Sequence, residues 1–331
     1  MSGSEGSFQA RRFAVEVLEG RMTDRNIANR LMEMGKDGES PEDLVGMISV
    51  FYPPSKRIST KHPIVMDLCG TGGAPVRSFN VSTISSFVLA STHVPVAKHG
   101  NRSSLGRCGS ADLLEAMGAD ISPDIERTER MLNDIDFAFL FAPVYHPAMR
   151  HVAKARKMVP GRTIFNIMGP LMNPVLGRRR QLIGVCAPEL LDPVSQALIS
   201  LNVDRALVVH GLPGMDEASM CGPTLVAQVD GDGVERYEIT PEEFGLQRCL
   251  PEKVGELAPQ ASVRACNDIL RGKRNERRDM VLLNSGCALY AFGSVPSIAS
   301  GISLAEKAID SGAAFAKVQE YVSASNYRSD E

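Results

Sequence analysis

The chain has 331 residues, 44% hydrophobic and 23% charged, which is the composition of a folded globular protein with one large domain or two smaller ones. Its formal net charge of -3 leaves no basic footprint for nucleic acid, and the sequence has neither a membrane-spanning apolar stretch nor a signal peptide. From this charge and hydropathy we expect no membrane or nucleic-acid partner. The seven cysteines contain no Cys-x-x-Cys pair, so we expect free thiols in a reducing cytoplasm.

The first 62 residues predict a small helical domain. Apolar residues recur at helical spacing from Phe13 to Leu18 and again from Ile27 to Met32, where the pattern stops near Gly35. A third helix should begin at Ser40-Pro41, an N-cap serine followed by proline at the first helical position, and end before Pro53-Pro54.

From Ile64 onward, strands and helices alternate. Apolar runs predict strands at Ile64–Leu68, Val94–Ala97, Phe137–Phe141, Leu182–Cys186 and Ala206–Val209. This alternation predicts an α/β domain over residues 63–331 with a central, mostly parallel sheet and right-handed crossovers. A helical piece at about 146–161 should return to the first domain, and the capping box Ser303–Glu306 should start the last helices.

Two glycine-rich turns stand at predicted strand ends, within Asp67–Thr83 and Lys98–Asp112. Each leads into a helical pattern with a plausible Ser/Thr N-cap, and glycine lets backbone N–H groups at a helix start approach an anion. Gly72-Gly73 alone would be read as a tight turn, because it lacks both the Walker ending and the dinucleotide-binding spacing. Two such turns in succession suggest a multiply phosphorylated ligand.

A third feature is the adjacent carboxylate pair Asp216-Glu217, in a loop that follows the strand ending at Val209. Mg²⁺ uses one or two carboxylates and takes its other ligands from water and phosphate. Alone, the pair would be read as a solvated loop; beside the glycine turns it suits a magnesium-phosphate ligand.

Several residues allow a plainer reading. His99 is as compatible with a structural histidine as with a ligand, and Asp112 suits the first turn of its helix through the macrodipole. Cys69 and Cys108 fit small-residue packing better than nucleophilic work, since no paired base is evident. The basic run Arg178–Arg180 reads as a solvated loop.

The motifs form an ordered set: Gly70-Thr71-Gly72-Gly73, Asn80-Val81-Ser82-Thr83, Lys98-His99-Gly100-Asn101-Arg102, Gly109-Ser110-Ala111-Asp112, His146-Pro147-Ala148-Met149, Arg162-Thr163-Ile164-Phe165-Asn166, Gly169-Pro170-Leu171, Asn173-Pro174 and Asp216-Glu217. In this order and spacing the set resembles the anthranilate phosphoribosyltransferase family, over about residues 8–325. The Lys98 and Gly109 blocks are also similar to pyrimidine nucleoside phosphorylases, which are the alternative enzyme class. A nucleotide- or nucleic-acid-binding relative without turnover is a further alternative, against which the intact Lys98, Arg102, Asp216 and Glu217 and the acidic pI argue.

The resemblance implies transfer of the phosphoribosyl group of 5-phosphoribosyl 1-diphosphate to anthranilate, with release of diphosphate, in tryptophan biosynthesis. It also implies two Mg²⁺ ions and a homodimer formed through the helical domain, with the substrates in a cleft between the domains. No residue is expected to act as nucleophile or base, since the attacking group is already a neutral amine, and catalysis should rest on positioning and electrostatics.

By the same resemblance, phosphoribosyl diphosphate would contact Gly70, Gly73, Ala74, Ser78, Asn80, Val81, Ser82, Thr83, Lys98, His99, Gly100, Asn101, Arg102, Ser103, Ser104, Leu105, Gly106 and Ser110. Anthranilate would contact Gly70, Asn101 and Arg156, and Mg²⁺ would contact Ser82, Asp216 and Glu217. The chain departs from the family at Ala74, where an acidic residue is usual, at Ser78, where threonine is usual, and at Leu105, Gly106 and Cys108 in a serine-rich stretch. These departures concern phosphate and metal handling more than the overall activity.

Overall fold

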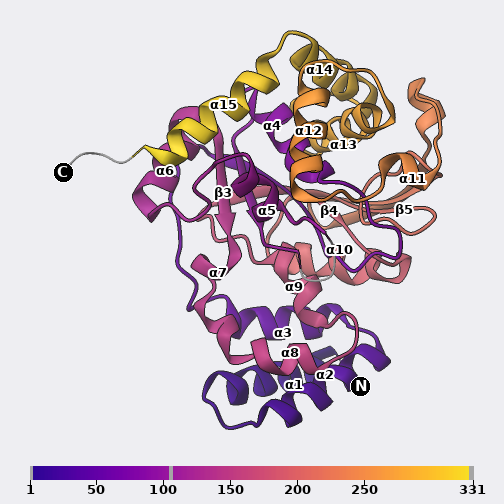
Figure 1. Ribbon diagram of the computed structural model, residues 1–331. Helices are drawn as coiled ribbons and strands as arrows, with labels where there is room; N and C mark the ends of the chain where they lie inside the picture. Colours follow the sequence, from indigo (N-terminus) through magenta and orange to yellow (C-terminus); the bar gives the residue numbers. More distant parts are fainter. Residues whose placement is uncertain (1–2, 104–106, 328–331) are drawn as a thin grey trace.

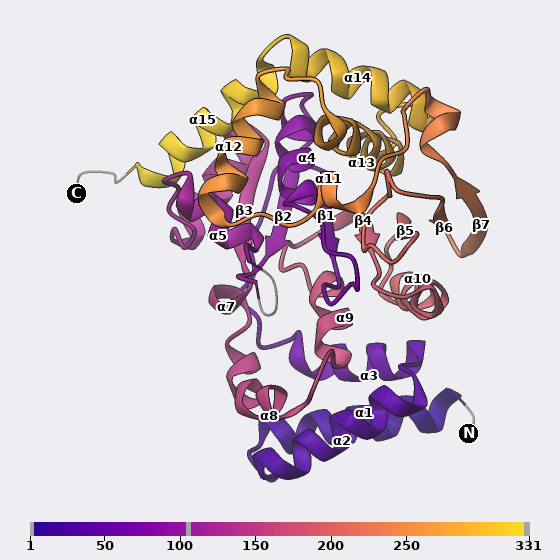
Figure 2. The same cartoon turned by 45° about the vertical axis from the view of Figure 1, so that its right-hand side comes forward.

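The computed structural model describes residues 3–103 and 107–327, which form a helical unit below a sheet with helices on both faces (Figures 1 and 2). The strands of the described chain form one seven-stranded sheet in the order β3-β2-β1-β4-β5-β6-β7. The strands are β1 (Ile64–Gly70), β2 (Val96–Gly100), β3 (Phe137–Phe141), β4 (Arg178–Gly184), β5 (Arg205–Gly211), β6 (Thr224–Asp230) and β7 (Gly233–Ile239). The pairs from β3 to β5 are parallel, and β6 and β7 add antiparallel, so the predicted mostly parallel α/β fold is confirmed.

The helices are α1 (Gly3–Leu18), α2 (Asp24–Asp37), α3 (Pro41–Phe51), α4 (Val81–Ala90), α5 (Ser110–Ala116), α6 (Ile125–Ile135), α7 (Ala142–Tyr145), α8 (Ala153–Met158), α9 (Ile164–Leu171), α10 (Leu191–Ser200), α11 (Pro251–Val254), α12 (Pro259–Leu270), α13 (Glu276–Phe292), α14 (Ile298–Asp310) and α15 (Ala313–Asn326). Short 3-10 helices are η1 (Pro147–His151), η2 (Pro188–Leu190) and η3 (Pro241–Phe244). None of the helices described is both long and apolar enough to cross a membrane.

Alternating side chains along the strands supply the cores on the two faces of the sheet. In β1, Met66 and Leu68 join a cluster with α4 and α12–α15, whereas Val65 joins one on the opposite face. In β4, Ile183 belongs to the cluster that contains α1–α3 and α8–α10.

The N-terminal helices form the unit expected from their apolar spacing, and the 146–161 segment packs with them (Figure 2). Ser40 caps α3 as predicted, in a capping box with Asp43. Phe51 of α3 meets Phe165 of α9 edge to face at 5.1 Å between ring centroids, which joins this unit to the helix below the sheet. The domain division at residue 62 stays a prediction.

Four local predictions were wrong. Arg178–Arg180 are not a loop but the start of β4, where Arg178 and Arg180 pair with Asp204. Ser303 does not start a helix, because α14 is already capped by Ser297. The N-cap residues of the helices after the two glycine turns are Asn80, before α4, and Gly109, before α5, and neither is a serine or threonine.

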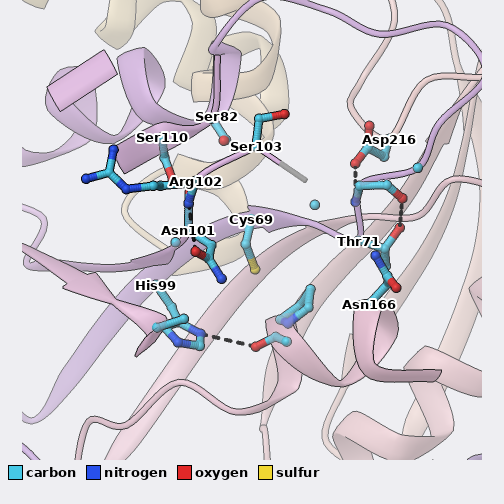
Figure 3. A pocket seen from close by; sticks show the side chains of 18 of the residues that line it. Cys69, Thr71, Ser82, His99, Asn101, Arg102, Ser103, Ser110, Asn166 and Asp216 are labelled. Carbon is cyan, nitrogen blue, oxygen red and sulfur yellow. Dashed lines mark hydrogen bonds between the residues drawn. The ribbon is translucent and has the colours of Figure 1, made fainter. Parts of the chain in front are cut away.

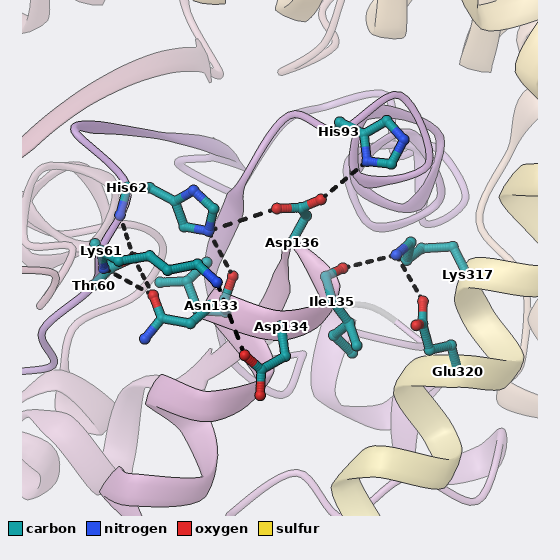
Figure 4. A network of polar contacts seen from close by, with 11 residues as sticks. Thr60, Lys61, His62, His93, Asn133, Asp134, Ile135, Asp136, Lys317 and Glu320 are labelled. Carbon is teal, nitrogen blue, oxygen red and sulfur yellow. Dashed lines mark hydrogen bonds and ion pairs between the residues drawn. The ribbon is translucent and has the colours of Figure 1, made fainter.

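The amino ends of the parallel strands carry a polar network (Figure 4). His62, before β1, and His93, before β2, both reach the carboxylate of Asp136, which precedes β3, at 3.5 and 3.4 Å. The Nζ of Lys317 on α15 donates to the carbonyl of Ile135, the residue next to Asp136. These contacts connect the amino ends of β1, β2 and β3 with α15, on the side of the sheet opposite to the carboxyl ends of the strands.

Candidate active site

A cavity of about 810 Å³ lies at the carboxyl ends of the parallel strands, above the helical unit. Every described residue predicted to contact a substrate or metal lines it: Gly70, Gly73, Ala74, Ser78, Asn80, Val81, Ser82, Thr83, Lys98, His99, Gly100, Asn101, Arg102, Ser103, Ser110, Arg156, Asp216 and Glu217. The predicted Ser104, Leu105 and Gly106 lie outside the described residues. Residues from distant parts of the chain therefore meet at the sheet edge where the strand pattern placed them.

Glycines end four of the parallel strands, and the close approach of neighbouring segments explains them. A Cβ on Gly70 of β1 would meet the Asp216 carboxylate, and one on Gly184 of β4 would meet the Asp216 backbone. A Cβ on Gly211 of β5 would likewise meet the Glu217 carbonyl oxygen. Without side chains at these strand ends, the loop carrying the two carboxylates can lie across the top of the sheet.

The first glycine turn contacts that loop directly. Gly72 and Gly73 have φ values of 66° and 78°, in the left-handed region that glycine adopts at little cost. The N–H of Gly72 donates to Asp216 Oδ2 at 2.8 Å (Figure 3). Asn80 precedes α4 and its Nδ2 donates to the Cys108 carbonyl at 3.0 Å, which joins the two glycine-rich turns.

Lys98 is buried at the end of β2, 2% exposed. Its Nζ donates to the Leu68 carbonyl at 2.7 Å and to Ser82 Oγ at 3.2 Å. Burial lowers the pKa of Lys98, and the nearby Asp67 opposes that shift. The ammonium thus lies beneath the first turn of α4, where it adds positive charge to the helix N-terminus.

Arg102 lines the cavity, but its guanidinium turns toward α5 (Figure 3). It contacts Glu115 through two hydrogen bonds of 2.7 and 2.9 Å and Asp112 through one of 3.0 Å. Asp112 also accepts from the N–H groups of Gly109 and Ser103. Asp112 therefore shapes the whole second turn in addition to the first turn of its helix.

His99 and His146 form a buried pair with defined protonation. His99 Nδ1 lies 3.1 Å from the Gly169 carbonyl, which can only accept, so this nitrogen carries the proton. His146 Nε2 then donates to His99 Nε2 at 3.1 Å, and His146 Nδ1 accepts from Ser55 Oγ at 2.8 Å. Burial lowers the pKa of His99 well below its usual value and that of His146 to about 4. Both rings are therefore neutral at physiological pH.

Arg156 of α8 approaches the cavity from the helical side. Its guanidinium lies 5.5 Å from the Phe165 ring centroid, and no carboxylate among the described residues pairs with it. Burial lowers the pKa of Arg156, although guanidinium remains charged. A partly desolvated cation next to an aromatic ring is suited to a planar ligand that carries a carboxylate.

Asp216 and Glu217 carry the anionic side of the site. Glu217 Oε1 accepts from Ser78 Oγ at 2.7 Å, while its buried Oε2 has no hydrogen-bond partner among the described residues. Burial, and for Glu217 also the neighbouring Asp216, raise the pKa of these carboxyls. An orphaned carboxylate oxygen beside a second carboxylate fits a divalent cation.

Such a cation would need further ligands from outside the protein. In the described part of the chain, no group of three or more His, Cys, Asp or Glu side chains could hold a metal ion. Hard-cation sites of this kind are completed by phosphate and water oxygens.

Some cavity residues carried no recognised signal in the sequence. Glu256 follows α11 and accepts from the N–H of Arg107 at 3.0 Å. Glu256 is brought to the cavity by the backbone pairing of the preceding residue, Gly255, with Ser78, a tertiary contact that no local sequence pattern predicts. Met149 and Phe165 also line the cavity, and Phe165 lies next to Arg156; both belong to family-like motifs, but an apolar side chain in a motif does not by itself indicate a ligand contact.

Comparison with known proteins agrees with these features. The family model described as "Glycosyl transferase family, a/b domain" matches residues 62–315. The anthranilate phosphoribosyltransferases of Rubrobacter xylanophilus and Aquifex aeolicus are 43% and 41% identical, covering 96% and 94% of this chain and 92% of each relative. The crystal structure of anthranilate phosphoribosyltransferase from Thermus thermophilus is 35% identical and superposes with a TM-score of 0.89, covering 99% of this chain and 96% of that one.

A Saccharomyces cerevisiae anthranilate phosphoribosyltransferase solved with PRPP and Mg shares the fold, with a TM-score of 0.86 at 24% identity over 98% of this chain and 93% of that one. The ordered motifs, the cavity at the strand ends and the identities of 41–43% over almost the whole chain lead to one assignment. The chain belongs to the anthranilate phosphoribosyltransferase family.

Proposed function

We propose that this cavity transfers the phosphoribosyl group of 5-phosphoribosyl 1-diphosphate to the amine of anthranilate, releasing diphosphate, in tryptophan biosynthesis. The observation that carries the proposal is a single cavity with two different ends. One end has glycine turns, a buried lysine and two carboxylates; the other has the guanidinium of Arg156 beside an aromatic ring.

The diphosphate belongs at the glycine-turn end. Backbone N–H groups of Gly73 and of the first turn of α4 would donate to its oxygens, as helix N-termini do for anions. The ammonium of Lys98 below α4 adds to this positive potential. Arg102, held by Asp112 and Glu115, would contribute mainly by fixing the second turn, so that Asn101, Ser103 and Ser110 face the ligand.

Mg²⁺ fits beside the diphosphate, and we propose two ions. Ser82 would contact one ion, while Asp216 and Glu217 would hold the other. When bound, Mg²⁺ would neutralise charge on the departing diphosphate. The protein holds the two carboxylates in place by hydrogen bonds: the N–H of Gly72 donates to Asp216, and the hydroxyl of Ser78 donates to Glu217.

Anthranilate belongs at the other end, with its carboxylate on Arg156 and its ring against Phe165 and Met149. Gly70 and Asn101 would lie between the two substrates. The amine would then face C1 of the ribose, and alignment replaces the need for an activated nucleophile. We do not propose His99 as a base, because its unprotonated nitrogen, Nε2, accepts a hydrogen bond from His146.

Outside the cavity, we propose a homodimer through the helical unit and a cytoplasmic location. Phe8 on α1 and Met158 on α8 are 66% and 52% exposed, which supports an interface on this unit. The reaction itself is tested by the loss of anthranilate fluorescence in the presence of phosphoribosyl diphosphate and Mg²⁺.

A further inference from the structure

A side chain behind the main cavity holds the backbone that follows Asp216 and Glu217. Asn284 lies in the middle of α13 and is 3% exposed. Its Oδ1 accepts from the N–H of Ala218 at 3.0 Å, and its Nδ2 donates to the Ala218 carbonyl at 2.9 Å. One side chain therefore satisfies both backbone polar groups of the residue next to Glu217.

The orientation of this amide is fixed by its partners. Nδ2 also donates to the Met280 carbonyl at 2.9 Å, one turn earlier in α13. A flipped amide would place its NH₂ against the Ala218 N–H and its oxygen against two carbonyls, so all three hydrogen bonds would be lost. Asn284 thus acts toward Ala218 as a neighbouring strand would.

Ala218 needs such a partner because it belongs to no strand or helix and is fully buried. On the other side, the loop rests on the strand-end glycines, where Gly184 contacts the Asp216 backbone and Gly211 contacts the Glu217 backbone. Asn284, Asp216 and Glu217 together line a small second cavity. The carboxylate loop is therefore held between the glycines of the sheet and one residue of α13.

We propose that Asn284 is a positioning residue that holds the Asp216-Glu217 loop in the geometry that binds Mg²⁺. The inference rests on the proposed function, since it assumes that these carboxylates bind the metal. Two buried carboxylates side by side repel each other, so a loop that carries them tends to separate them unless its backbone is held. Asn284 supplies that hold without itself touching metal or substrate.

The test compares Asn284→Ala with Ser285→Ala in the full chain. Ser285 is the adjacent residue of α13, fully buried, and its Oγ has no hydrogen-bond partner among the described residues. Both variants are assayed well below their unfolding midpoints, with initial rate measured against Mg²⁺ and against each substrate. We expect Asn284→Ala to raise the Mg²⁺ concentration for half-maximal rate about tenfold or more, the size expected for losing one or two buried hydrogen bonds. The Michaelis constant for anthranilate should stay near the wild-type value, and Ser285→Ala should behave as wild type.

Asn284→Asp provides a second variant if the alanine protein does not fold. It keeps the side chain's size and the acceptor for Ala218 N–H but loses both donated hydrogen bonds, so the Mg²⁺ requirement should again rise. Binding of Mn²⁺ in the presence of inorganic diphosphate, followed by paramagnetic resonance, reports the same change without turnover. The inference would be overturned if both Asn284 variants kept the wild-type Mg²⁺ concentration for half-maximal rate. It would also be overturned if that concentration and the Michaelis constant for anthranilate rose by the same factor. If the wild type itself shows no turnover with anthranilate, the proposed function fails instead.

Discussion

Arg156 is the residue on which recognition of the acceptor should depend. Arg156→Ala should raise the Michaelis constant for anthranilate about tenfold or more, because a charge-assisted hydrogen bond contributes about 1.5–3 kcal/mol. The constant for phosphoribosyl diphosphate should change little. Lys157→Ala, the next residue of α8 and exposed, is the matched control. If the Michaelis constants for both substrates rose by the same factor, Arg156 would not be a specific contact for anthranilate.

Ala74, one of the positions where the chain departs from the family pattern, is only 3% exposed and packs in the cluster that contains the helical unit. A carboxylate there would be desolvated, so Ala74→Asp should lower the unfolding midpoint as well as change the Mg²⁺ profile. Thermal unfolding and rate against Mg²⁺ are measured beside Ala74→Ser, which adds polarity without charge. Superimposable Mg²⁺ curves for Ala74→Asp and wild type would place this position outside the metal's reach.

The histidine pair links four segments of the chain: Ser55 after α3, His99 in β2, His146 before η1 and Gly169 in α9. Since the folded-state pKa of both rings lies below the unfolded value near 6.5, the unfolded chain binds protons first as pH falls. The free energy of unfolding should therefore be constant above that value and decrease as pH falls from about 6.5 toward 4.

The measurement is denaturant unfolding across this pH range for wild type and His146→Gln. Substitution should flatten the decrease in the free energy of unfolding, because the variant lacks one of the two buried imidazoles. A wild-type curve that is flat down to pH 4 would contradict a neutral buried pair.

The loop between β5 and β6 carries Asp216 and Glu217, the two carboxylates that we propose as Mg²⁺ ligands. Asp216→Asn with Glu217→Gln removes two charges that repel each other, so turnover should fall strongly while stability changes little or rises. Asp232→Asn with Glu235→Gln, exposed on the β6–β7 hairpin, is the matched control. Retention of the wild-type Mg²⁺ dependence in the Asp216/Glu217 variant would exclude these residues as ligands.

For the whole molecule, the sequence predicted the α/β sheet and the glycine turns because both depend on short-range pattern: apolar runs of strand length, and glycine next to polar residues. The sequence did not predict α13, because this helix has buried residues on all of its faces and therefore shows no amphipathic period. The run Arg178–Arg180 was misread because Arg178 and Arg180 pair with Asp204, a contact made only by folding. Glu256 and Asn284 reach the site through tertiary contacts, so no local signal could have indicated them.

Anthranilate fluorescence reports whether this one cavity joins anthranilate to the phosphoribosyl group. The purified chain is mixed with anthranilate and Mg²⁺, with and without phosphoribosyl diphosphate. We expect fluorescence to decrease only when phosphoribosyl diphosphate and Mg²⁺ are both present, with diphosphate released in equal amount. No decrease with anthranilate, together with phosphate-dependent cleavage of a pyrimidine nucleoside, would rule out anthranilate as the acceptor and assign the cavity to a nucleoside phosphorylase.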